Sequence, residues 1–101
     1  MKIKSFSEHL EKRLDKEEIK EIEQAAKIEF DALQALQNEV SQAVIHYMSD
    51  NNIGFNDMVS KLGKSPSQLS KIIKGEANLT VSTIAQISSI MGYKPHLHFA
   101  R

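Results

Sequence analysis

Residues 63–75, GKSPSQLSKIIKG, contain signals for both ends of a short helix. Ser65 can cap an exposed helix N-terminus, and Pro66 fits the first helical position, where a backbone N–H is not needed. Gly75 suits the left-handed residue that follows the last turn. Between these signals the apolar residues recur at helical spacing, which predicts an amphipathic helix. Its buried side is Leu69, Ile72 and Ile73, and its outer side is Ser67, Gln68, Ser70, Lys71 and Lys74.

The outer side of this helix carries hydrogen-bonding groups and only positive charge. The stretch from Met58 to Gly75 contains no acidic residue, although the whole chain balances 13 basic against 13 acidic residues. Its four lysines are Lys61, Lys64, Lys71 and Lys74. A local basic strip of this kind favours contacts with phosphates, and an ordinary solvated lysine face is the alternative interpretation.

The composition limits the class of protein. A chain of 101 residues without cysteine forms one domain, or one domain with an appendage, and has no disulfide or thiolate chemistry. No apolar run approaches the roughly 18 residues of a membrane helix, and the N-terminus does not resemble a secretion signal. We therefore expect a cytoplasmic protein without a membrane partner.

Residues 1–36 predict a helical N-terminal extension that is rich in charge. They hold seven Lys or Arg against nine Asp or Glu, and neither glycine nor proline occurs before Gly54. From Ile19 to Tyr47 apolar residues keep a spacing of three and four, which predicts a helix from about Lys16 to about Asp50, with or without a bend near residue 37. This apolar seam either closes an intramolecular bundle or belongs to an arm that binds a partner chain.

Residues 37–92 have turn and cap residues at the spacing of a helix-turn-helix domain. One helix is predicted for residues 55–62, a tight turn follows at Gly63, and the helix described above comes next. Thr80 caps a last helix that ends before Gly92. We expect the buried side of that last helix to be formed by Ile84, Ile87, Ile90 and Met91.

Residues 93–101 form a tail in which the period of the pattern changes. Apolar and polar residues alternate from Tyr93 to Phe99, which predicts a short β-strand. Because no second strand is evident in the sequence, we expect this strand to pair with a second copy of the chain or with another protein's sheet. The expected dimerisation residues are Tyr93, Leu97 and Phe99.

Residues 40–92 resemble the helix-turn-helix domain of the XRE family, also called the Cro/CI-repressor family. The resemblance implies an all-α, lambda-repressor-like DNA-binding domain, here with a helical N-terminal extension and a short C-terminal β-strand. The matching positions are Ile53, Met58, Val59, Leu62, Gly63, Ser65, Leu69, Ser70, Ile72, Gly75, Leu79, Thr80, Val81, Thr83, Ile84, Ile87, Met91 and Gly92.

The order of the parts is similar to that of HigA-type antitoxins, because a charged helical extension precedes the domain and a short strand follows it. That resemblance implies a repressor of its own operon that neutralises an mRNA-cleaving RNase toxin of the RelE or HigB type. It also implies a homodimer that places two recognition helices about 34 Å apart on a palindromic operator of double-stranded DNA.

Transferred position by position, the resemblance assigns DNA contacts to the predicted helix of residues 66–73 and its flanks. Lys71 is expected to pair with a guanine edge, and Ser67 or Gln68 to bond to an adenine edge or a phosphate. Lys64 and Lys74 are expected to contact phosphates, and Lys61 is a weaker candidate of that kind. The whole expected set is Ser65, Pro66, Ser67, Gln68, Ser70, Lys71, Lys64, Lys74 and Lys61.

Two alternatives to the antitoxin remain open. The first is a stand-alone XRE-family regulator whose extension packs on its own bundle or forms the dimer. The second is a protein-interaction module with a degenerate DNA-binding face. Phe55 and Pro66 favour the interaction module. At the position of Phe55 the family commonly has a polar residue, and the position of Pro66 could hold a side chain that reads a base.

We expect neither catalysis nor a bound cofactor or metal. The four histidines are His9, His46, His96 and His98, of which only the last two share a face of the predicted strand. Two histidines without further ligands do not form a zinc site, and we interpret them as surface or dimer-interface residues. The sequence also contains no glycine-rich phosphate loop and no motif for an activated nucleophile.

Overall fold

The computed structural model describes residues 16–100, and the chain divides into two compact units, residues 1–33 and 34–101. Over the described range the secondary structure consists of α2 (Lys16–Asp50), α3 (Phe55–Leu62), α4 (Pro66–Ile73) and α5 (Val81–Met91). The predicted helical bounds are confirmed for all four, and α2 runs through residue 37 without a break.

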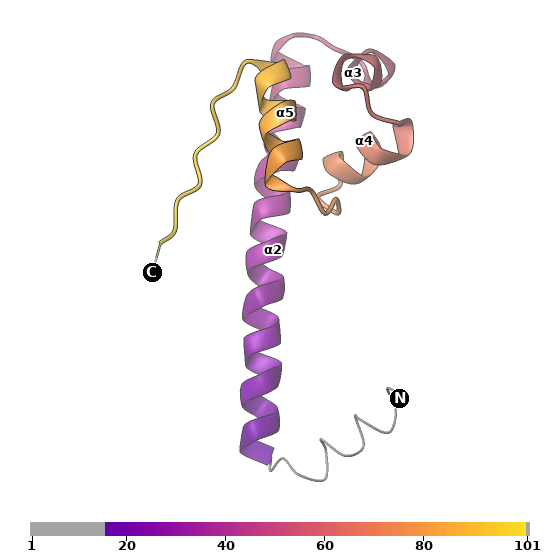
Figure 1. Ribbon diagram of the computed structural model, residues 1–101. Helices are drawn as coiled ribbons and strands as arrows, with labels where there is room; N and C mark the ends of the chain where they lie inside the picture. The colour runs from indigo at the N-terminus through magenta and orange to yellow at the C-terminus, as the bar shows by residue number, and fades with distance from the viewer. Residues whose placement is uncertain (1–15, 101) are drawn as a thin grey trace. The chain divides into compact units, whose positions relative to one another are not determined.

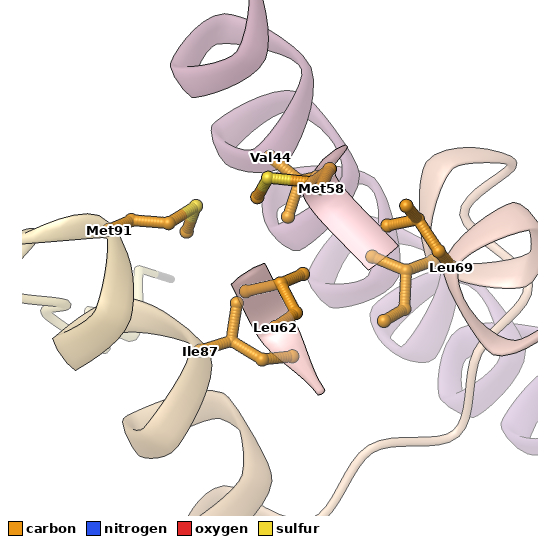
Figure 2. Packing of buried hydrophobic residues seen from close by; sticks show 7 residues of the cluster. Val44, Met58, Leu62, Leu69, Ile87 and Met91 are labelled. Atoms are coloured by element: carbon orange, nitrogen blue, oxygen red, sulfur yellow. The ribbon is translucent and has the colours of Figure 1, made fainter. Parts of the chain in front are cut away.

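The second unit is built around the C-terminal part of α2. Figure 1 shows α3, α4 and α5 gathered beside this part of the helix. Within this unit α3 packs against both α4 and α5. The core is formed by the fully or almost fully buried side chains of Val44, Met58, Leu62, Leu69, Ile72, Ile87 and Met91, most of which are labelled in Figure 2.

Left-handed glycines separate the short helices. Gly63, with φ of 65°, ends α3 and turns the chain into α4. Gly92, with φ of 75°, ends α5, while the Thr80 side chain caps its first turn by accepting a hydrogen bond from the Thr83 N–H. Because only glycine adopts this conformation without a steric penalty, the turn signals in the sequence predicted these ends correctly.

The predicted β-strand at Tyr93–Phe99 is wrong. Between residues 16 and 100 no strand is present, and residues 93–100 are irregular. The Tyr93 N–H donates to the Ser88 carbonyl at 2.9 Å and so completes the end of α5, while the side chains of Leu97 and Phe99 are exposed. Alternation along a sequence predicts a strand only if another strand accepts its hydrogen bonds, and the described chain offers none.

The predicted buried side of α5 is correct for Ile87 and Met91 and wrong for Ile90. The Ile90 side chain is 40% exposed, whereas Ser88 is buried. The face of α5 that packs on the core is therefore slightly rotated from the most apolar face of the helix. In the part of the chain that the structure covers, no helix is long and apolar enough to cross a membrane.

Candidate nucleic-acid interface

Helix α4 begins with a complete capping box. The Ser65 hydroxyl accepts a hydrogen bond from the Gln68 backbone N–H at 3.1 Å, and the Gln68 side-chain Oε1 accepts one from the Ser65 N–H at 2.9 Å. Pro66 occupies the first turn, where its missing N–H leaves no backbone group unsatisfied. These interactions fix the N-terminal end of α4, which is the end that points at base edges in a docked helix-turn-helix.

The predicted outer face of α4 is accessible. Leu69 and Ile72 are buried beneath it, as the spacing predicted, and Ile73 is half-buried. The exposed members of the expected set are Lys61, Ser65, Pro66, Ser67, Gln68, Lys71 and Lys74, and the half-buried ones are Lys64 and Ser70. The structure therefore brings hydroxyl, amide and ammonium donors together along one short helix and the turn before it.

The capping box limits how Gln68 can read a base. Bidentate recognition of adenine needs one donor and one acceptor from the same side-chain amide. The Oε1 atom of Gln68 already accepts the Ser65 N–H, so Nε2 is the group left to face a ligand. Gln68 is thus suited to a single hydrogen bond to a phosphate or base acceptor. The side chains of Lys71 and Ser67 form no hydrogen bond within the described residues, so they are better suited to base contacts.

An open depression of about 310 Å³ lies between α4 and the loop that follows it. Lys64, Gln68 and Lys71 line the α4 side, and Glu76 and Asn78 line the loop side together with apolar neighbours. Two lysines thus line the α4 side and one glutamate the loop side, so the α4 side carries the positive charge. The sign of this charge agrees with the phosphate contact that the sequence analysis expects of Lys64.

Polar side chains of α2 hold the C-terminal end of α4 and the loop after it. The Gln34 amide donates to the Gly75 carbonyl at 3.0 Å, and the Gln37 amide donates to the Ala77 carbonyl at 3.0 Å and to the Asn78 Oδ1 atom at 3.2 Å. The buried Ser41 hydroxyl donates to the Ile73 carbonyl. Carbonyls at a helix end have no intrahelical partner, and α2 supplies these bonds in place of water.

These α2 donors are the residues that the sequence analysis missed. Gln34, Gln37 and Ser41 follow one another at spacings of three and four, which places them on one helical face. That spacing was the available signal. It was hidden because the same helix carries the stronger apolar pattern, and because polar residues on a long helix are usually solvated.

The predicted dimerisation residues do not form one cluster. The Tyr93 ring packs edge-on against the Tyr47 ring, with centroids 5.9 Å apart, and the Lys61 ammonium lies 5.8 Å from the Tyr47 centroid. Tyr93 therefore anchors the start of the tail within one chain. Further along the tail, the large apolar residues Leu97 and Phe99 are 63% and 85% exposed.

No histidine within the described residues belongs to the expected DNA-contact set. His46 on α2 and His96 and His98 on the tail are exposed, and His9 lies outside the described range. Across residues 16–100 no group of three or more metal-binding side chains is assembled.

Comparison with known proteins gives one match. Residues 60–97 match the model of a family described as helix-turn-helix, and the match begins in α3 and includes α4 and α5. The match agrees with the helix-turn-helix that the sequence predicts, and the chain is in this part similar to a helix-turn-helix family. Searches of curated proteins and of solved structures each found no match.

Proposed function

We propose that this protein is a sequence-specific transcriptional repressor and the antitoxin of a type II toxin–antitoxin pair, acting in the cytoplasm without catalytic activity. Residues 37–92 would read the operator, and residues 1–36 would contact partners. The observation that carries the DNA-binding part is the helix-turn-helix match over a capped, exposed α4 whose accessible side is basic. The antitoxin part rests on the similarity in the order of the parts.

The proposed mechanism follows from two-fold symmetry. Two copies would present their α4 helices to successive major grooves of a palindromic operator, about 34 Å apart, and occupancy of the promoter would repress transcription. The exposed apolar residues at the C-terminal end, Ile90, Leu97 and Phe99, are suited to contacts between the copies without forming a sheet. The partner toxin would be a small RNase of the RelE or HigB type.

The test is a fluorescence-anisotropy titration of the protein with the DNA upstream of its own gene. An unrelated duplex of equal length is the control, and each titration is run at two salt concentrations. We expect binding that prefers the upstream DNA and weakens steeply with salt, because phosphate contacts release counterions. Binding that is absent, or equal for both duplexes, would reject sequence-specific repression.

Two lysine variants divide base contacts from phosphate contacts. Lys71→Ala should cost about 1–3 kcal/mol of operator binding and relax the preference at one base position, whereas Lys64→Ala should weaken both duplexes alike. Both lysines line the same depression, so the pair is matched in position. If Lys71→Ala leaves operator affinity unchanged, α4 is an ordinary surface helix.

One observation favours a second function, that of a protein-interaction module. Three residues at the start of α4 have little left to offer DNA. Ser65 and Gln68 form the capping box, and Pro66 has no backbone N–H to donate. With fewer free donors, the same face would suit a protein partner. The anisotropy titration separates the two functions, because the module would bind neither duplex in a sequence-dependent way.

A further inference from the structure

The part of α2 in the first unit carries an apolar stripe that nothing in the described chain covers. The stripe, residues 19, 22, 26, 30 and 33, keeps the helical spacing of three and four. Its large side chains Ile22, Phe30 and Leu33 are 56%, 60% and 43% exposed, and Ile19 is half-buried. A soluble helix that is exposed all round normally shows scattered apolar residues, so an aligned stripe of this kind marks a docking surface.

The charges beside the stripe indicate which kind of partner it fits. Residues 16–33 hold six carboxylates against three lysines, a net charge of −3. At about 100° per residue, Glu29 and Glu23 border the stripe on its two edges, while Lys20 and Lys27 lie further round the helix. The rim of the stripe is therefore acidic.

An acidic rim disfavours a second copy of this helix as the occupant. If two copies paired in parallel through a heptad seam of residues 19, 22, 26, 29 and 33, Glu29 would face its own copy. Like charges placed opposite each other in a helical seam oppose association. A partner helix with Lys or Arg beside its apolar seam would instead place a positive charge opposite these glutamates.

We propose that the stripe of residues 19–33 is the docking site for a basic protein that inserts an apolar helix face flanked by Lys or Arg. The helical length of these 15 residues, about 22 Å, matches a helix-in-groove or helix-on-helix contact of about four turns. The docking site rests on the proposed function, because it is the surface for the protein partner proposed there. It does not depend on DNA binding.

The test uses a defined probe and the full-length protein. The probe is a fluorescein-labelled synthetic helix of three heptads with Leu at the seam positions and Lys at the flanking positions, and its twin has Glu in place of Lys. Titration without DNA should show binding of the Lys peptide and at least tenfold weaker binding of the Glu twin. Equal binding of the twins, or no binding of the Lys peptide, overturns the proposal.

A matched pair of variants locates the contact. Phe30 and Ile28 lie two residues apart on one helix and are 60% and 63% exposed, but Ile28 is outside the stripe. Phe30→Gln should weaken binding of the Lys peptide at least tenfold, and Ile28→Gln should leave it unchanged. Equal effects of the two changes overturn the proposal.

Analytical ultracentrifugation of the same variants tests the other occupant. If Phe30→Gln, but not Ile28→Gln, lowers the oligomeric state of the free protein, the stripe belongs to a second copy and the proposal fails. An unchanged oligomeric state in both variants supports it. Because DNA titration uses a different probe, loss of operator binding and loss of peptide binding are separate results.

Discussion

Two parts of one helix, residues 16–33 and 34–50 of α2, share an apolar spacing and differ in burial. In the first part every described side chain is exposed except that of Ile19, which is half-buried. In the second part Val44 and Ser41 are buried, and Gln34, Gln37 and Ser41 hold the end of α4. The comparison teaches that helical periodicity identifies a face, whereas burial depends on which other segments reach that face.

The largest expected difference between the two parts is in core packing. Val44→Ala removes two methyl groups from a site with no exposed surface, so it should lower the free energy of unfolding by about 2 kcal/mol once the cavity is included. Ile22→Ala on the first part should change it by less than about 0.5 kcal/mol. Urea denaturation followed by circular dichroism measures both, and equal losses would contradict the comparison.

The next largest effect tests how closely the second part approaches α4. A Cβ added at Gly75 would lie 2.7 Å from Asn38 Oδ1, the far end of an exposed side chain that can swing aside, and the residue has φ of 72°. Gly75→Ala should therefore cost about 1–2 kcal/mol of unfolding free energy, mostly from the left-handed conformation.

Gly63→Ala is the matched control for Gly75→Ala. Its φ of 65° is similar, and no atom lies within 4 Å of the added Cβ. We expect the two costs to agree within about 0.5 kcal/mol, because both arise mainly from the left-handed backbone conformation. A much larger cost at Gly75 that the additional change Asn38→Ala removes would show that α2 is held rigidly against the end of α4.

The smallest expected effect concerns the glutamines of the two parts. Gln37→Ala removes a donor to the Ala77 carbonyl and to Asn78, and should cost about 1 kcal/mol of unfolding free energy. Gln24→Ala on the exposed first part should be neutral or slightly stabilising, because alanine is the better helix former. Thermal denaturation of both variants checks this, and equal melting temperatures would show that the Gln37 bonds add nothing over water.

The helix ends were predictable because they depend on neighbours in sequence. Ser65, Pro66 and Gly75 define α4 through local hydrogen bonds and allowed backbone angles, and the structure has those ends where the sequence places them. The accessible face of α4 followed from the same short-range pattern. The predicted strand failed because a strand requires a distant partner. The exposure of Ile90 likewise depends on which face of α5 other segments cover.

Part of the candidate interface also depends on distant residues. The depression beside α4 forms only when residues 76–79 fold back toward Lys64 and Lys71, and Gln37 holds that loop from about 40 positions away. The spacing of Ser65 and Gln68 allows a capping box. Only the two hydrogen bonds in the structure show that this box occupies the Gln68 Oε1 atom, which bidentate contact with adenine would need.

The sequence by itself determined the helices, their ends, the helix-turn-helix spacing and the basic side of α4, since each follows from interactions over a few neighbouring residues. Tertiary structure alone decided which apolar face is buried, which polar side chains of α2 hold α4, and that the tail of residues 93–100 is not a strand. These outcomes depend on whether a segment remote in sequence provides a packing surface or a hydrogen-bond partner. A local sequence pattern does not reveal whether such a segment is present.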